Sequence, residues 1–250
     1  MSGDISRILL KWGRAMLEDV LERGLNELRL PAGAEIISRF RVYYDALARA
    51  NAVMNLTAIT GEDETARKHF LDCAAPLLLF PMEGASLIDV GTGAGFPGLP
   101  LKLLCPALRL TLLDSQRKRV DFLREGCGAL SLSDVECVHA RAEDLAPAAR
   151  REKYDYAASR AVARLNVLCE LCLPYVKTGG AFLALKGPAA EEELTEAGRA
   201  IPALGGTLES VFDYAVPGEE LRHNVVVIRK TAPAPKKYPR PFAQIKKYPL

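Results

Sequence analysis

The sequence has no long uncharged hydrophobic segment that could span a membrane. Its longest apolar run extends from Cys73 to Met82 and contains Pro76 and Pro81, whereas a transmembrane helix needs about 20 apolar residues. The N-terminal segment lacks the basic-then-apolar pattern of a secretory signal, because charged residues from Asp4 to Arg14 interrupt it. We therefore expect a soluble, cytoplasmic protein with no membrane partner.

The sequence also lacks the paired motifs of a structural metal site. One Cys-x-x-Cys spacing occurs, at Cys169 and Cys172, but it lies in a helical pattern and has no second pair. The other cysteines are scattered through apolar segments of a chain that is long enough to fold without disulfides. We expect reduced, mostly buried thiols and no metal.

Acidic residues are missing from the C-terminal end of the chain. Residues 222–250 contain eight Lys and Arg residues and no Asp or Glu, whereas the whole chain has a formal net charge of only +2. A basic end on a slightly acidic body indicates a polyanionic partner, and a solvated tail that aids solubility is an equal alternative. Tyr238 and Tyr248, among these basic residues, suit contact with a nucleic-acid backbone and its bases, and docking against the domain is the alternative.

Hydrophobic periodicity divides the chain into three parts: a helical region over residues 1–84, an α/β domain over 85–230 and a basic tail over 231–250. In the first part we expect a helix ending at Gly24, a second helix over Ala34–Arg49, a loop over Asn51–Thr60 and a third helix over Asp63–Phe80. The run Thr231–Pro235 reads as a semi-rigid linker into the tail.

The middle part alternates between strand-like and helix-like segments, which predicts a parallel sheet with right-handed crossovers. The expected strands are Ser86–Val90, Leu108–Leu113, Val135–His139, Tyr154–Ala158, Ala181–Leu185, Thr207–Val216 and Asn224–Arg229. The expected helices are Leu99–Cys105, Gln116–Ala129, Leu165–Val176 and Ala189–Leu204. No long helix separates the last two strands, so we expect them to pair as an antiparallel end of the sheet.

A glycine-rich turn follows the first of these strands. Asp89, Gly91, Gly93 and Gly95 form an Asp-x-Gly-x-Gly-x-Gly pattern. A dinucleotide fingerprint needs a third glycine where this chain has Phe96, so that fingerprint fails. The pattern instead resembles the first motif of class I S-adenosylmethionine-dependent methyltransferases, in which the acid can serve the cationic methionyl end of the cofactor.

Acidic residues after the next two strands fit the same cofactor. Asp114 ends the second strand and can accept hydrogen bonds from ribose hydroxyls, which suits NAD equally well. After the third strand, the Ala142 backbone N–H can donate to an adenine ring and Glu143 can accept from its exocyclic amine. An exposed pair, Glu143-Asp144, at the start of a helix is the alternative for this position.

At this point the chain closely resembles the RsmG family, also called GidB, from about Val53 to Leu250. The matching motifs are Asn55-Leu56-Thr57, His69-Phe70-Leu71-Asp72, the run from Asp89 to Pro100 with its Gly95-Phe96-Pro97-Gly98 extension, Asp114-Ser115 with Lys118-Arg119 and Phe122-Leu123, Arg141-Ala142-Glu143, Ser159-Arg160-Ala161, Gly179-Gly180, Ala184-Leu185-Lys186-Gly187 and Tyr238-Pro239-Arg240.

The resemblance implies an enzyme that methylates N7 of one guanosine in bacterial 16S ribosomal RNA near the decoding site. It implies a class I methyltransferase fold, a Rossmann-like seven-stranded sheet with an N-terminal helical extension, and S-adenosylmethionine as cofactor. The partner would be small-subunit ribosomal RNA or the 30S subunit, and we expect a monomer. The residues implied at the cofactor are Gly91, Phe96, Ser115, Ala142, Glu143 and Arg160, and those implied on the RNA side are Arg141, Arg160, Lys186 and Arg222.

The expected chemistry needs no general base, because guanine N7 carries a lone pair and no proton. Catalysis would depend on in-line positioning and exclusion of water. Since methylation makes the base cationic, we expect the basic residues to hold phosphates or guanine O6 rather than N7. His69 and Asp72 share a helix face, and for them we expect a structural role.

Other functions remain alternatives: a class I methyltransferase acting on another RNA, a protein or a small molecule, an NAD-binding oxidoreductase, and a non-catalytic RNA-binding protein. The acid-free tail argues against a protein or small-molecule substrate, and Phe96 argues against NAD. Retention of Asp89, Asp114 and Glu143 together argues against a vestigial loop.

Overall fold

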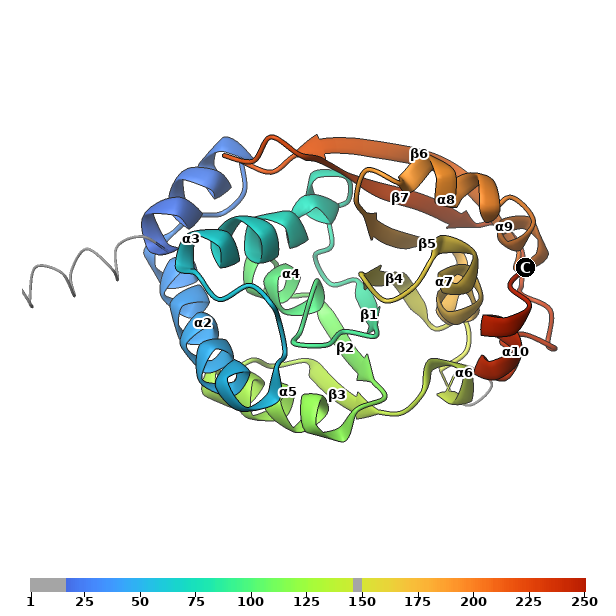
Figure 1. Cartoon of the computed structure of the whole chain (residues 1–250), viewed down its shortest axis with the longest axis horizontal. Coiled ribbons are helices and arrows are strands. Elements are labelled where there is room, and N and C mark those ends of the chain that lie inside the picture. The colour runs from blue at the N-terminus through green and yellow to red at the C-terminus, as the bar shows by residue number, and fades with distance from the viewer. Residues whose placement is uncertain (1–16, 146–149) are drawn as a thin grey trace, which may run out of the picture.

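The computed structural model describes residues 17–145 and 150–250 and is built on a seven-stranded sheet (Figure 1). The strand order is β3-β2-β1-β4-β5-β7-β6. Strands β1 to β5 are mutually parallel, whereas β7 runs antiparallel to both of its neighbours, β5 and β6. The strands are β1 (Ser86–Val90), β2 (Arg109–Asp114), β3 (Val135–His139), β4 (Tyr154–Arg160), β5 (Val176–Lys186), β6 (Gly206–Ala215) and β7 (Arg222–Lys230). The predicted class I methyltransferase sheet with an antiparallel end is confirmed.

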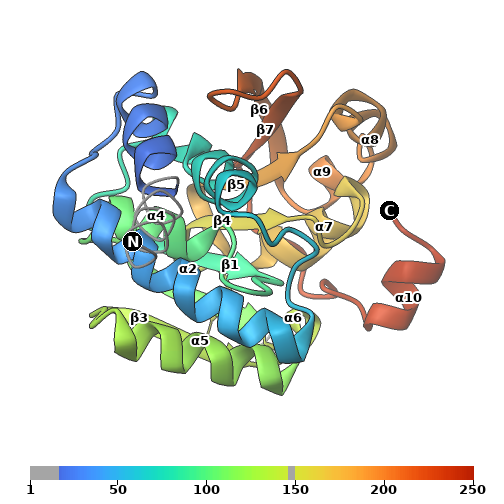
Figure 2. The ribbon, with the colours of Figure 1, turned by 60° about the vertical axis from the view of Figure 1, so that its left-hand side comes forward.

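Helices cover both faces of the sheet, so a central strand is apolar on both sides. Leu87 of β1 belongs to one buried cluster and its neighbour Ile88 to the other. On the Leu87 face lie α2 (Ala34–Met54), α4 (Gly98–Leu104) and α5 (Arg117–Ala129), with α2 alongside α5 (Figure 2). On the Ile88 face lie α6 (Ala142–Leu145), α7 (Leu165–Cys172), α8 (Ala190–Glu196), α9 (Ala200–Ala203) and α10 (Phe242–Lys247).

The strand order reverses at β1. The chain passes from β1 outward to β2 and β3, and then returns to the other side of β1 as β4. In open parallel sheets, ligands bind beyond the carboxyl ends of the strands at such a reversal. The turns after β1 and β4 therefore mark the position of the expected site.

The N-terminal helices share their core with the sheet. Phe40, Tyr43 and Phe70 are buried in the same cluster as Leu87 and Leu112. The predicted boundary at residue 85 lies one residue before β1, and no separate core lies on its N-terminal side within the described residues.

The first two predicted helices extend further along the chain than the sequence pattern predicts. Residues 17–27 are helical, so Gly24 does not end the first helix. Its missing side chain makes room for Leu71, which a Cβ would meet at 2.3 Å. The second helix continues to Met54 and takes up the start of the expected loop. Ile8, Leu9, Trp12 and Met16, the first members of the predicted apolar pattern, lie outside the described residues.

Three of the long predicted helices are broken up in the structure, two of them at turns that contain proline. The segment expected over Asp63–Phe80 consists of α3 (Glu62–Thr65), a π-helical turn over Ala66–Leu71 and a 3₁₀ turn over Ala75–Leu78 that contains Pro76. The segment expected over Leu165–Val176 changes at Cys172 into a short 3₁₀ turn with Pro174, and β5 begins at Val176. The stretch expected as one helix over Ala189–Leu204 forms α8 and α9.

The C-terminal segment is packed against the domain. Arg151 donates hydrogen bonds to the carbonyl oxygens of Ala234 and Tyr238, and Ile245 of α10 is completely buried. Arg240 forms an ion pair with the fully buried carboxylate of Glu170 on α7 at 2.6 Å. Of the alternatives for this segment, the structure favours docking against the domain over a solvated tail, since its apolar residues and its buried ion pair fix it to the α7 face.

Candidate functional site

The glycine-rich turn after β1 lines a cavity of about 400 Å³, which we call the loop cavity. Its floor comes from the turn itself, one wall comes from the end of β2, and the other comes from the turn after β4. The lining residues are Leu56, Thr57, His69, Gly91, Thr92, Gly93, Ala94, Phe96, Asp114, Ser115, Arg119, Arg160, Ala161 and Val162. Gly91, Gly93, Phe96, Asp114, Ser115 and Arg160 are thus brought together as the sequence predicts.

Asp89 supports the turn from beneath. Its side chain is fully buried, and one carboxylate oxygen accepts hydrogen bonds from Thr92 Oγ1 at 2.7 Å and from the Gly98 backbone N–H at 2.8 Å. Burial raises the pKa of Asp89 to about 7, although both hydrogen bonds oppose that shift. This carboxylate holds the turn in shape and is not among the residues that line the cavity, so its service to the methionyl end of the cofactor remains a prediction.

Two glycines of the turn have different tasks. Gly93 has a positive φ of 61°, and a Cβ built on it would have no atom within 4 Å, so its open side belongs to the cavity. Gly95 also has a positive φ, but its Cβ would meet the Tyr43 hydroxyl at 2.7 Å and Leu99 at 2.6 Å. Gly95, predicted at the cofactor, instead permits close packing of the turn against α2 and α4.

Asp114 stands at the end of β2 as expected. Its carboxylate accepts hydrogen bonds from the backbone N–H groups of Gly93 at 3.0 Å and Gln116 at 2.8 Å, and Arg119 lies 3.5 Å away. These contacts fix the carboxylate at the rim of the loop cavity with lone pairs left for ribose hydroxyls. The residues of the loop cavity therefore fit an adenosine-type cofactor.

Ala142 and Glu143 begin α6 at the same edge of the sheet, but they are not among the residues that line the loop cavity. The Ala142 carbonyl oxygen accepts a hydrogen bond from the buried Tyr175 hydroxyl at 2.6 Å. Their contact with adenine remains a prediction.

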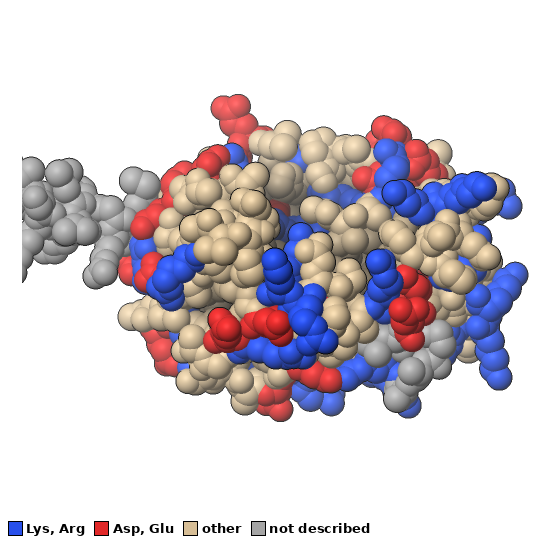
Figure 3. Space-filling model, turned by 60° about the horizontal axis from the view of Figure 1, so that its bottom comes forward, with Lys and Arg blue, Asp and Glu red and all other residues tan. Residues whose placement is uncertain are grey.

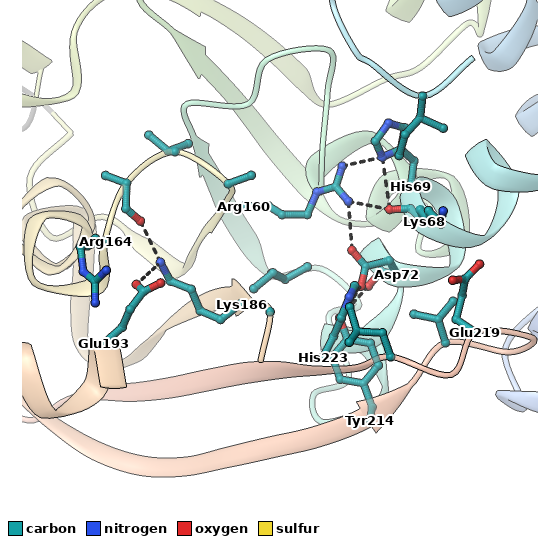
Figure 4. Close-up of a pocket in the computed structure, with 18 residues that line it drawn as sticks. Lys68, His69, Asp72, Arg160, Arg164, Lys186, Glu193, Tyr214, Glu219 and His223 are labelled. Atoms are coloured by element: carbon teal, nitrogen blue, oxygen red, sulfur yellow. Dashed lines mark hydrogen bonds and ion pairs between the residues drawn. The ribbon is translucent and has the colours of Figure 1, made fainter. Parts of the chain in front are cut away.

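A second cavity of about 720 Å³, which we call the adjoining cavity, lies next to the first (Figure 4). The two cavities share His69, Arg160, Ala161 and Val162. The other lining residues come from the π-helical turn, the ends of β4 and β5, α8 and the β6–β7 hairpin, and those with polar or charged side chains are Lys68, Asp72, Arg164, Lys186, Glu193, Tyr214, Glu219 and His223. A cofactor in the first cavity would thus have its reacting end beside room for a substrate.

Arg160 lies at the boundary between the cavities. Its guanidinium donates to Asp72 Oδ2 at 2.9 Å, to the Lys68 carbonyl oxygen at 2.8 Å and to His69 Nδ1 at 2.9 Å, and it also covers the Phe96 ring at 5.0 Å. His69 must be neutral to accept from Arg160, and it hydrogen-bonds through Nε2 with Thr57 Oγ1 at 2.8 Å. Burial and the Arg160 charge lower the pKa of His69 to about 4, in agreement with a neutral ring.

The other predicted basic residues are spread over different environments. Lys186 is buried and donates to Glu193 at 2.6 Å and to the Ala163 carbonyl oxygen at 2.8 Å, within the adjoining cavity. Arg222 begins β7 next to His223 and pairs with Asp213 on the exposed surface, outside the cavity lining. Arg141 is exposed, and its guanidinium covers Phe242 at 5.9 Å.

Sequence reasoning missed Tyr214 and His223. Both donate to Asp72 Oδ1, the Tyr214 hydroxyl at 2.7 Å and His223 Nδ1 at 2.6 Å. No motif marks them, because the sheet joins them to Asp72 across about 140 to 150 residues of chain. Of the tail tyrosines, Tyr238 is buried and so has no face for base stacking, whereas Tyr248 is 62% exposed.

Basic side chains are unevenly distributed over the surface. Figure 3 shows Lys and Arg gathered at the right-hand end of that face and along its lower part, with acidic groups between them. Separately, within residues 17–145 and 150–250 no helix is long and apolar enough to span a membrane.

Comparisons with known proteins agree with this geometry. The model of the GidB family, described as rRNA small subunit methyltransferase G, matches residues 36–221. The ribosomal RNA small subunit methyltransferase G of Clostridium botulinum (strain Loch Maree) is 45% identical over 234 residues, 93% of this chain and 98% of that protein. The protein of the same name from Pelotomaculum thermopropionicum is 46% identical over 238 residues, 94% of this chain and all of that protein.

Solved structures support the fold. The crystal structure of a SAM-dependent methyltransferase from Aquifex aeolicus matches with a TM-score of 0.50 and 20% identity, over 64% of this chain and 90% of that one. The sequence relatives cover nearly the whole chain at an identity far above that level. The protein with the two adjoining cavities therefore belongs to the GidB family, the rRNA small subunit methyltransferase G family.

Proposed function

We propose that this chain transfers the methyl group of S-adenosylmethionine to N7 of a guanosine in 16S ribosomal RNA near the decoding site. The observation that carries the proposal is the pair of cavities that meet at Arg160 and His69. One has the glycine turn and ribose-facing acid that suit the cofactor, and the other is large enough for an unstacked base. Sequence-specific recognition of RNA commonly uses such splayed bases.

Bound S-adenosylmethionine would supply a methyl group activated by the sulfonium charge. Gly93 would leave room for the methionyl part and Asp114 would hold the ribose, while Phe96 and Val162 would exclude water from the boundary. Since N7 of guanine needs no deprotonation, the task of the protein is alignment. Both ring nitrogens of His69 are engaged in hydrogen bonds, Nδ1 with Arg160 and Nε2 with Thr57, which agrees with a positioning role.

The charges of the adjoining cavity suit a reaction whose product is cationic. Arg160 is paired with Asp72 and Lys186 is paired with Glu193, so neither cation stands without a counter-charge. Ionised carboxylates beside these cations reduce their repulsion of N7-methylguanosine. In this arrangement Arg160 and Lys186 hold O6 or phosphate oxygens, and the exposed Arg222 and Arg141 hold the RNA backbone outside the cavity.

We also propose that the chain acts as a monomer in the cytoplasm, where its RNA substrate would be. The large exposed hydrophobic side chains among the described residues are divided among five parts of the chain: α2 (Val42 and Val53), the turn after β4 (Val162), β6 (Leu208 and Val211), the β6–β7 connection (Leu221) and the residue after α10 (Tyr248). Scattered apolar residues of this kind do not make an extended interface. Sedimentation equilibrium of the purified protein should give the mass of one chain, and a stable dimer would contradict this part of the proposal.

The central experiment incubates the purified protein with radiolabelled S-adenosylmethionine and small subunits that lack the modification. Digestion to nucleosides and mass spectrometry should find the label in N7-methylguanosine. Parallel reactions with naked 16S RNA, with other RNAs and with NAD test the alternatives. Absence of label from guanosine N7 in every RNA would overturn the proposal, and label in a different RNA would change its substrate.

A further inference from the structure

Asp72 gathers side chains from three strands at one end of the adjoining cavity (Figure 4). It follows the π-helical turn, and its carboxylate accepts from Arg160 at the end of β4, Tyr214 on β6 and His223 on β7. Only 4% of its surface is exposed. Burial opposes its ionisation, but the His223 hydrogen bond and the Arg160 charge outweigh burial and lower the pKa of Asp72.

His223 forms a hydrogen bond with Asp72 through Nδ1, and its ring is part of the lining of the adjoining cavity. Because an ionised carboxylate can only accept, Nδ1 carries the proton in the 2.6 Å contact with Asp72 Oδ1. The edge of the ring packs against Tyr214 at 6.1 Å between centroids. Among the described residues, no hydrogen-bond partner is recorded for Nε2, the nitrogen on the other side of the ring.

The cations around the same cavity are already engaged with carboxylates. Lys68 pairs with Glu64, Arg164 with Glu192 and Glu196, and Lys186 with Glu193. Arg160 likewise uses part of its guanidinium on Asp72, Lys68 and His69. His223 differs from these groups in that its contact with Asp72 sets the ring orientation and leaves a second nitrogen available to a ligand.

We propose that His223 is a positioning residue for the RNA substrate: Asp72 orients its ring so that Nε2–H donates to an oxygen of the RNA in the adjoining cavity. The acceptor is either O6 of the target guanine or a phosphate oxygen beside it. This inference rests on the proposed RNA methyltransferase function and adds a recognition group that no sequence motif indicated.

The charges that face His223 favour the protonated ring. The hydrogen bond to Asp72 raises the pKa of His223, burial lowers it, the charges of Asp72 and Glu219 raise it, and the Arg160 charge lowers it, with a net increase. Tyr214 faces the ring as a neutral hydroxyl, since burial holds its pKa far above neutrality. In the protonated state both ring nitrogens donate, and the hydrogen bond to RNA is charge-assisted.

Two substitutions distinguish the role of Nδ1 of His223 from that of Nε2. His223→Asn keeps a side-chain amide near the position of Nδ1 for Asp72 but removes the donor toward the cavity. His223→Gln extends an amide toward the position of Nε2 and does not titrate. His139→Asn is a matched control, because His139 is exposed and hydrogen-bonds to the Ser115 carbonyl oxygen.

The experiment measures KM for undermethylated small subunits, kcat and S-adenosylmethionine affinity between pH 6 and pH 9. In wild type, KM should rise as pH passes the pKa of His223. His223→Asn should raise KM about tenfold at pH 6, the size expected for a lost hydrogen bond to a charged group. It should also remove that pH dependence and leave cofactor affinity within about twofold. His223→Gln should recover part of the loss without restoring the pH dependence.

The salt dependence of KM at pH 6 identifies the acceptor. A contact with phosphate releases a counterion, so His223→Asn would lower the slope of log KM against log salt by up to about 1. An unchanged slope together with a raised KM assigns the contact to O6.

Different failures have different meanings. If wild type methylates RNA but His223→Asn keeps the wild-type KM and pH profile, the inference is wrong. The inference would also be overturned if His223→Asn lost as much affinity for S-adenosylmethionine as for RNA. It would likewise be overturned if His139→Asn lost the pH dependence of KM. If wild type methylates no RNA at all, the proposed function fails first.

Discussion

Arg160 donates a hydrogen bond from Nη1 to Asp72 Oδ2 at 2.9 Å, and this ion pair forms part of the wall between the loop cavity and the adjoining cavity. The side chains are 15% and 5% exposed, so each charge depends on the other for compensation. The pair links the turn after β4 to the π-helical turn, two segments 88 residues apart in sequence. It therefore fixes the boundary at which methyl transfer would take place.

Replacement of Gly93 by Ala should weaken S-adenosylmethionine binding at least tenfold, because the Cβ would enter the open side of the loop cavity. Gly84→Ala is the matched control: Gly84 has a similar φ of 69°, has no neighbour within 4 Å of a Cβ, and does not line either cavity. Both variants should lose about 1 kcal/mol of stability from left-handed strain. Isothermal titration should show a loss of affinity in Gly93→Ala alone, and unchanged affinity there would contradict the placement of the cofactor.

Asp89→Asn should change how stability depends on pH. The pKa of Asp89 is raised to about 7 in the folded protein, above its ordinary value of 3.8. The folded state therefore binds a proton that the unfolded state releases, so this contribution is complete below about pH 4 and disappears as pH rises to about 7. In that window the free energy of unfolding of wild type should fall relative to the variant by up to about 1.4 kcal/mol per pH unit. Urea titrations at several pH values measure it, and parallel curves would show that Asp89 ionises normally.

Arg240→Ala should destabilise the fold by about 3 kcal/mol, because it leaves the carboxylate of Glu170 buried without its partner. The double variant Glu170→Gln/Arg240→Ala should recover part of the loss, since the buried charge is then gone. Lys246→Ala, an exposed change on α10, should stay within about 0.5 kcal/mol. Denaturant unfolding provides the comparison; equal stability of Arg240→Ala and Lys246→Ala would mean that the C-terminal segment is not anchored at Glu170.

Arg222→Ala should raise KM for RNA several-fold and leave cofactor affinity intact, because Arg222 lies between Leu221 and His223, which both line the adjoining cavity. Arg229→Ala offers a control on the same strand. Arg222 and Arg229 both form cross-strand ion pairs with acids of β6, Asp213 and Glu209, but Arg229 lies near the opposite end of β7. Methylation assays at two salt concentrations should also show a smaller salt slope for Arg222→Ala alone. If the two substitutions changed the KM for RNA equally, Arg222 would have no specific contact with RNA.

The sequence was sufficient to predict that several residues of the loop cavity lie together. Gly93, Phe96 and Asp114 stand next to strands whose apolar runs are easily recognised, and the local turn carries them to one edge of the sheet. Local periodicity was weaker where tertiary contacts override it. Gly24 reads as a helix stop, yet it is needed inside a helix because Leu71 packs against it. For residues 231–250 the sequence left a solvated tail and a docked segment as alternatives, and the contacts with Glu170 and Arg151 favour the docked segment.

By itself, the sequence determined the sheet, the glycine-rich turn and the family, because each depends on residues close together in the chain. The tertiary structure alone decided which charges meet. It buried Asp89 beneath the turn, and it brought Tyr214 and His223 to Asp72 across about 140 to 150 residues. Burial and neighbouring charges set the charge states of His69 and Asp89. Both depend on contacts between residues that are distant in the chain, so only the folded structure shows them.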